Sequence, residues 1–162
     1  SSFDLTTTDE DGTNWDFFLL SMRNKAVRRL CDEEPLFLIV TIMCTRFSPL
    51  MRMWEYRMDP QEFQNLRAEA RMHLEFICKL CRIQHERGKY FLHEHPEGAN
   101  SWKEPMVRRL LEDYRVYECT GHMCQFGMVS EDKQGTGPVK KPTRFMTNAL
   151  MIRDRLNRKC RD

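Results

Sequence analysis

The feature that most constrains the fold of this chain is a long amphipathic helix placed between two short apolar runs. Residues 60–87 carry apolar side chains at helical spacing, Asp59 can cap the first turn, and Gly88 follows the last one. The apolar runs, residues 36–41 before the helix and 90–94 after it, have the length of buried strands. A strand, a helix and a second strand in this order predict a βαβ unit with parallel strands and a right-handed crossover.

Weaker patterns around this unit complete an α/β domain. The chain has 162 residues, which suits one domain, so we take residues 1–162 as a single unit. Further elements are expected as helices at residues 14–31, 101–111 and 148–158, a weak strand at 116–120, and a strand pair at 124–129 and 143–147 joined by a long loop. The sequence therefore predicts a partial Rossmann-like α/β fold, with a mostly parallel sheet, flanking helices and a C-terminal strand pair.

Charge is nearly balanced over the chain, with 26 basic residues, 24 acidic residues and a net charge of +2. Such a balance gives no overall electrostatic footprint for nucleic acid. Basic residues gather in two clusters toward the C-terminus, at residues 140–144 and 153–161. The candidate nucleic-acid-binding residues are Lys140, Lys141, Arg144, Arg153 and Arg158. The alternative is that both basic clusters are ordinary solvated surface.

The seven cysteines form an odd set without the spacing of a disulfide framework, which favours an intracellular, reducing compartment and leaves the organelle open. Cys78 and Cys81 make a CxxC pair, but they fall in the middle of the long helix, so we expect buried helical cysteines rather than a zinc site. On a strand His93 and His95 face one way and Glu94 the other, so we expect no metal there either.

No segment of the sequence suits a membrane span or export. The longest apolar run, residues 36–40, is far too short to cross a bilayer, and no signal-peptide pattern opens the chain. Because the chain begins at Ser1 rather than at methionine, we expect it to be processed or to be a piece of a longer polypeptide.

Two reactive side chains fall where an open α/β sheet binds its ligands. Cys44 comes just after the first predicted strand, and Glu94 ends the second. If the two strands are neighbours, their carboxyl ends share one crevice, and a thiol and a carboxylate would meet there. This pair suits addition to a cytosine flipped out of its stack, in which a thiolate attacks C6 and a carboxyl group protonates N3. The alternatives are a small packed cysteine and a surface glutamate.

Several motifs, in order along the chain, resemble those of DNA cytosine-C5 methyltransferases, in particular the phage-type branch and methyltransferase-like segments of retroelement polyproteins. The motifs are residues 4–7, 15–17, 42–48, 93–102, 123–127 and 141–148. The resemblance extends over most of the chain. It implies that Cys44 corresponds to the family's nucleophile and that Glu94 corresponds to the glutamate that contacts the target cytosine.

The chain departs from the family pattern in two places. The paired prolines before the family's cysteine are Ile42 and Met43 here, and the glycine-rich turn that holds S-adenosylmethionine is absent. The resemblance therefore implies an N-terminally truncated domain. No cofactor is expected in this chain, and S-adenosylmethionine is expected only if the missing half is supplied.

From these observations we expect a non-catalytic, retroelement-derived module that binds other protein subunits of a larger assembly, with DNA or RNA as a further partner. In that case Cys44 and Glu94 are relics of a lost active site. One alternative is the catalytic half of a cytosine-C5 methyltransferase that receives its cofactor-binding segment from elsewhere. Another is a mobile-element polyprotein domain that handles the element's own nucleic acid.

Overall fold

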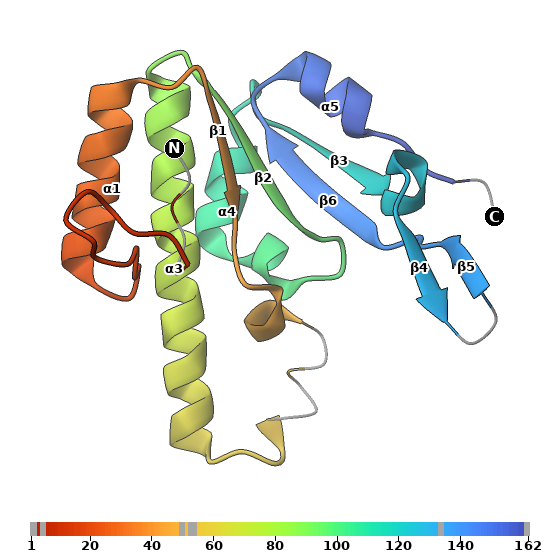
Figure 1. Cartoon of the computed structure of the whole chain (residues 1–162), viewed down its shortest axis with the longest axis horizontal. Coiled ribbons are helices and arrows are strands. Elements are labelled where there is room, and N and C mark those ends of the chain that lie inside the picture. The colour runs from red at the N-terminus through yellow and green to blue at the C-terminus, as the bar shows by residue number, and fades with distance from the viewer. Residues whose placement is uncertain (1–2, 4–5, 49–50, 52–54, 133–134, 161–162) are drawn as a thin grey trace.

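A computed structural model of the chain describes residues 3, 6–48, 51, 55–132 and 135–160 and has an α/β arrangement (Figure 1). The helices are α1 (Leu20–Glu33), α3 (Pro60–Glu86), α4 (Pro105–Leu111) and α5 (Leu150–Leu156), with short 3-10 helices η1 (Cys44–Phe47), η2 (Asn100–Lys103) and η3 (Met123–Phe126). The strands are β1 (Phe37–Thr41), β2 (Tyr90–Pro96), β3 (Tyr117–His122), β4 (Val129–Asp132), β5 (Gly135–Pro138) and β6 (Pro142–Thr147). The predicted α/β class is therefore confirmed.

The long helix and its two flanking strands form as the sequence predicts. β1 and β2 are parallel neighbours in a register that places Thr41 opposite Glu94. α3 begins where expected because the Asp59 carboxylate accepts hydrogen bonds from the N–H groups of Gln61 and Glu62, at 2.9 and 3.0 Å. The local pattern of caps and apolar positions was sufficient to predict this part of the fold.

The main sheet is mixed, so the expectation of a mostly parallel, Rossmann-like sheet is wrong. The strand order is β1-β2-β6-β3, in which β1 and β2 pair in parallel, whereas β6 runs antiparallel to both β2 and β3. The chain reverses direction after β3, passes through the β4–β5 hairpin and returns as β6 between β2 and β3 (Figure 1). Two of the three pairings in this sheet are consequently antiparallel.

The expected C-terminal strand pair is also wrong. Residues 143–147 do lie in a strand, β6, but most of its expected partner, residues 124–129, forms η3 and a turn. Gly127 ends η3 with a φ of 83°, a left-handed conformation that interrupts an extended strand. The segment 130–142, expected as a loop, contains most of the β4–β5 hairpin, whose glycine-rich second strand has no alternating apolar pattern.

Three helices begin later than expected. α1 begins at Leu20 rather than at residue 14, and at the other two the polar side chains at the expected starts have tertiary partners instead. The Asn148 side chain accepts a hydrogen bond from the N–H of Phe91 at 2.9 Å, and α5 begins only at Leu150. The Ser101 hydroxyl lies 2.6 Å from a ring nitrogen of His95, and the segment around it forms η2 rather than the start of α4. Long-range contacts therefore override local capping at both places.

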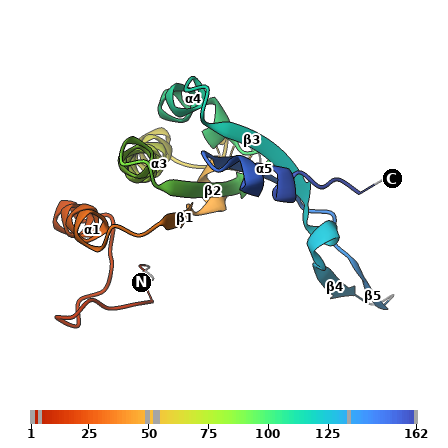
Figure 2. The same cartoon turned by 90° about the horizontal axis from the view of Figure 1, so that it is seen from above.

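Helices cover the two faces of the sheet unequally (Figure 2). α3 and α4 lie on one face, with α1 beside α3 at the β1 end, and α5 lies on the other face over β3 and β6. The main core lies between α3 and the sheet, where fully buried side chains include Leu74, Cys81, Phe91, Val107 and Met146. On the opposite face the part of the sheet made by β1 remains open, and Ile39 is 64% exposed.

Candidate functional site

The two residues predicted to carry chemistry belong to neighbouring strand ends. Because Thr41, the last residue of β1, pairs with Glu94, the carboxyl ends of β1 and β2 meet at one edge of the sheet. Cys44 begins η1 directly after β1, but its side chain lies outside the described part of the structure. Glu94 is half-buried and projects from the face opposite to His93 and His95. A contact between the Cys44 thiol and the Glu94 carboxylate therefore stays a prediction.

On the helix-covered face, β2 carries a buried histidine pair. His93 and His95 are both fully buried, with ring centroids 6.2 Å apart. The Nδ1 atom of His93 lies 3.3 Å from the carbonyl oxygen of Val40, and that of His95 lies 2.6 Å from the hydroxyl of Ser101. Neither Nε2 atom has a hydrogen-bond partner among the residues that the structure describes. Burial lowers the pKa of each ring to about 4, so both rings are neutral near physiological pH.

The basic residues predicted to bind nucleic acid do not form one surface. The Arg144 guanidinium lies over the Trp102 ring at 5.4 Å on the helix-covered face, whereas Arg153 belongs to α5 on the other face and pairs with Asp154 at 2.8 Å. Lys140 and Lys141 are exposed just before β6. Nucleic-acid binding by these residues stays a prediction, and the arrangement favours the lysines over Arg144 as exposed contacts.

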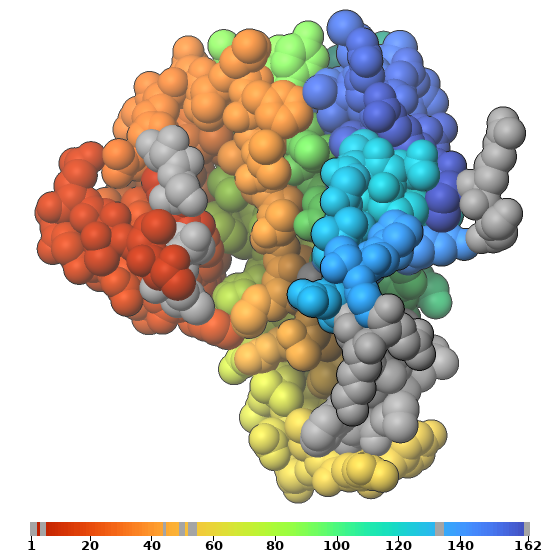
Figure 3. All heavy atoms as spheres, turned by 45° about the vertical axis from the view of Figure 1, so that its right-hand side comes forward, coloured from red at the N-terminus to blue at the C-terminus, as the bar shows by residue number. Residues whose placement is uncertain are grey.

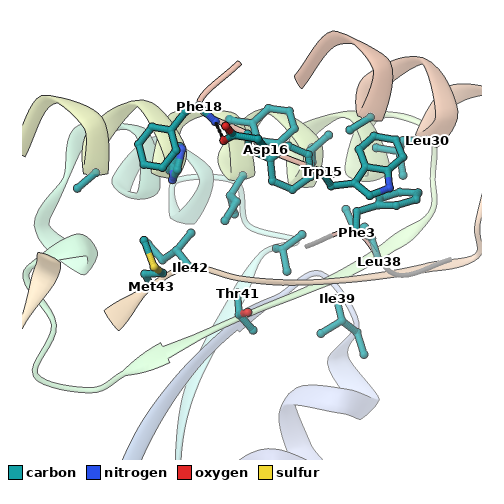
Figure 4. A pocket seen from close by; sticks show the side chains of 18 of the residues that line it. Phe3, Trp15, Asp16, Phe18, Leu30, Leu38, Ile39, Thr41, Ile42 and Met43 are labelled. Carbon is teal, nitrogen blue, oxygen red and sulfur yellow. Dashed lines mark hydrogen bonds between the residues drawn. The ribbon is translucent and has the colours of Figure 1, made fainter. Parts of the chain in front are cut away.

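A pocket that the sequence did not predict follows β1 for its whole length. Its volume is about 900 Å³, and β1, α1, α3 and the N-terminal segment all contribute to its walls (Figure 4). Figure 3 shows the same hollow between the N-terminal part of the chain and β1. The walls are largely apolar and include Trp15, Phe17, Phe18, Leu30, Leu38 and Phe76. No single segment carries a recognisable pattern for this pocket, because α3 closes it against the N-terminal segment, α1 and β1.

Polar groups stand at the end of the pocket nearest to η1. Arg46 forms an ion pair with Glu69 of α3, and both residues line the pocket. His73 lies beside the Phe18 ring, with centroids 4.2 Å apart, and its Nε2 atom is buried without a hydrogen-bond partner in the described part of the chain. Burial lowers the pKa of His73, with the positive charges of nearby arginines acting in the same direction. This end of the pocket can therefore accept a polar group, whereas the remainder is largely apolar.

The pocket borders an open sheet edge. The N–H of Tyr90 donates to the carbonyl oxygen of Leu36 at 3.0 Å. This bond determines which residues of β1 direct their backbone groups toward β2. Because backbone groups alternate along a strand, Phe37, Ile39 and Thr41 direct their N–H and C=O groups away from β2. Among the described residues no strand pairs with this outer edge. A row of main-chain donors and acceptors thus lies beside an apolar pocket.

The side chains of β1 divide between the pocket and the open face. In Figure 4, Leu38 and Ile42 lie on the side of Phe3, Trp15 and Phe18, whereas Ile39 and Thr41 project from the other side of the strand. Leu36, just before β1, is 66% exposed. Both sides of the outer edge are therefore apolar, which is unusual for a strand edge exposed to water.

The residues after β1 form no glycine-rich turn of the kind that holds S-adenosylmethionine. The chain has no glycine between Gly12 and Gly88, so a glycine-rich turn cannot follow β1. The side chains of Met43, Arg46 and Phe47 line the pocket at that point instead.

No group of three or more histidine, cysteine or acidic side chains in the described residues has the arrangement of a metal site. None of the described helices is long and apolar enough to cross a membrane.

Comparisons with known proteins identified no relative of this chain. No protein-family model matches the chain, and no significant match was found among curated proteins or among solved structures.

Proposed function

We propose that this domain is a non-catalytic binding module that accepts an extended polypeptide strand along the outer edge of β1. The observation that carries the proposal is the apolar pocket of about 900 Å³ beside a strand edge that no described strand pairs. In a larger assembly, a segment of another subunit would extend the sheet beyond β1. The order of motifs shared with cytosine-C5 methyltransferases supports an origin of the module in that family.

The chemistry of the edge favours a polypeptide as the occupant. The outward N–H and C=O groups of Phe37, Ile39 and Thr41 are spaced for the main chain of an added strand. A segment that pairs with all of β1 would have about five residues and a length of about 16 Å. Side chains on one side of this strand would enter the pocket beside Leu38, and those on the other side would cover Ile39. An apolar strand therefore satisfies both the backbone edge and the two apolar surfaces.

The test compares two substitutions at one position of β1. Ile39→Pro removes an outward N–H and leaves the bonds to β2 in place, because proline is tolerated on the free side of an edge strand. Ile39→Thr is the matched control, since it changes the exposed side chain but keeps the N–H. A displayed library of peptides of about seven residues, apolar at alternate positions, supplies the probes.

Peptides selected on the wild-type domain should bind Ile39→Thr with similar affinity and Ile39→Pro at least about tenfold more weakly. Thermal unfolding of both variants verifies that the fold is retained. Equal binding to all three proteins would place the site elsewhere. A library that yields no peptide above the background of an unrelated domain would refute the proposal.

The second candidate function is a catalytic half of a cytosine-C5 methyltransferase. The observation that favours it is the parallel pairing of β1 and β2, which puts the Cys44 segment and Glu94 at adjacent strand ends. In this function the Cys44 thiolate would add to C6 of a flipped cytosine while the Glu94 carboxyl group stabilises N3. Calorimetry with S-adenosylmethionine separates the two functions. Tight binding by this chain alone would refute the non-catalytic module, and no binding with any candidate partner would refute the catalytic half.

A further inference from the structure

A separate cluster of reactive side chains lies where the C-terminal segment passes the end of β3, on the far side of the sheet from β1 (Figure 1). The N–H of His122 donates to the carbonyl oxygen of Arg158 at 2.8 Å, so the residues after α5 run beside this strand end. The same path brings Cys160 to His122 and to Cys124 of η3. Two thiols and an imidazole therefore meet from parts of the chain that are distant in sequence.

The hydrogen bonds of His122 define its protonation at this site. Its Nδ1 atom accepts the backbone N–H of Cys160 at 3.2 Å and lies 3.0 Å from the Sγ atom of the same residue. Because a backbone N–H can only donate, this ring nitrogen carries no proton. Its lone pair therefore also faces the thiol of Cys160, and the imidazole is placed to accept the proton of that thiol.

The two thiols interact with each other and are open to small molecules. A hydrogen bond with the Cys124 side chain, followed by desolvation on burial, raises the pKa of Cys160, which disfavours the Cys160 thiolate. Both side chains are only partly buried. Cys78 and Cys81, by contrast, are both buried in α3, and burial raises the pKa of Cys78 to about 12. Reactivity toward a small oxidant should therefore be greater at the β3 end than at the cysteines of α3.

We propose that Cys124 and Cys160 form a reversible disulfide by exchange with a low-molecular-weight disulfide such as oxidised glutathione. The Cys124 thiolate attacks one sulfur of the glutathione disulfide, and the first glutathione leaves as a thiolate and takes up a proton. Nδ1 of His122 then accepts the Cys160 proton, and the Cys160 sulfur attacks the Cys124 sulfur. The second glutathione leaves and receives the proton from His122. Two protein thiols lose two electrons and two protons, which reduce glutathione disulfide to two thiols.

The disulfide would fix the segment after α5 against η3. In the reduced form this segment is held beside β3 by hydrogen bonds at His122 and by the Arg158 guanidinium, which lies 5.8 Å from the centre of the Phe126 ring. A covalent bond between Cys124 and Cys160 would make the same arrangement independent of those contacts. The site is separate from the β1 edge, so the result of testing one proposal does not affect the other.

The experiment incubates the folded, full chain with oxidised glutathione, blocks the remaining thiols with an alkylating reagent and identifies linked peptides by mass spectrometry. The expected result is a peptide pair joined through Cys124 and Cys160, whose bond reduced glutathione reverses. The Cys160→Ser variant should stop at a glutathione adduct on Cys124. Cys31→Ser, which removes another partly buried cysteine, should behave as the wild-type chain does.

A control in urea shows whether the fold directs the reaction, because an unfolded chain should yield mixed pairings. Two results would overturn the proposal: stable glutathione adducts on both cysteines of the wild-type chain without a link, or a link from either cysteine to a different partner. Full formation of the link in His122→Gln at the wild-type rate would remove the imidazole from the mechanism. If His122→Gln unfolds, His122→Asn replaces it, with the same expected loss of rate.

Discussion

The buried histidines of β2 make the stability of the domain depend on pH between about pH 5 and about pH 7. His93 and His95 are fully buried, and burial lowers the pKa of each from about 6.5 to about 4. His93 is packed against Trp102 and His95, and Arg144 stands opposite His95 on β6, so no carboxylate among these neighbours compensates a positive ring. Protonation of either ring in the folded state is therefore unfavourable.

The sign of the effect follows from which state binds the proton. The folded pKa lies below the unfolded one, so the stabilisation is complete above the unfolded value and is lost as the pH falls toward the folded value. At about pH 5 the unfolded chain binds nearly one proton per histidine and the folded chain binds almost none. The free energy of unfolding should consequently fall by about 2 kcal/mol for each histidine between about pH 7 and about pH 5.

Urea unfolding at a series of pH values measures this dependence, and the His93→Leu variant isolates the contribution of one ring. The variant should lose about half of the pH dependence assigned to the pair, whatever its absolute stability. The pKa values of the rings can be followed directly by NMR. A variant with the full wild-type slope, or titration of both rings near their ordinary pKa, would refute the reasoning.

Three further predictions concern the helix cap, the core and the basic residues. Asp59→Ala removes the cap of α3 and should lower the free energy of unfolding by about 1 kcal/mol in urea titrations, and no change would contradict the capping role. Leu74→Ala opens a cavity at a fully buried position and should cost about 2–5 kcal/mol, so a loss below about 1 kcal/mol would show that this part of the core is not close-packed. If the domain binds DNA or RNA, alanine at Lys140 and Lys141 should lower the salt dependence of log affinity by about 0.9 per lost phosphate contact, and more than Arg144→Ala does; unchanged affinity would place the site elsewhere.

The sequence was informative where local rules decide the structure. Asp59 and Gly88 mark the two ends of the long helix, and the short apolar runs beside it have the length of strands. The expected burial of the first run is wrong, because β1 lies at the edge of the sheet and Ile39 is 64% exposed. From these features the parallel pairing of β1 and β2 follows, and with it the adjacent positions of Glu94 and the Cys44 segment. This part of the candidate site could be predicted because it depends on one βαβ unit.

The sequence was not informative where contacts between residues distant in sequence determine the structure. Nothing local to residues 143–147 indicates that this strand enters the sheet between β2 and β3. Asn148 and Ser101 are good capping residues, yet their side chains bond to Phe91 and His95, which only the folded chain brings near. The pocket along β1 depends on the same kind of information, since α3 closes it against the N-terminal part of the chain.

Hydrogen exchange at the amides of β1 tests the central claim most directly. A bound strand would pair with the outward N–H groups of Phe37, Ile39 and Thr41 but not with those of Leu38 and Val40, which face β2. Addition of a peptide selected for binding should therefore slow exchange at the three outward amides and leave the two inward amides unchanged. Equal effects on both sets, or no effect on the outward set while the peptide is bound, would contradict strand addition at this edge.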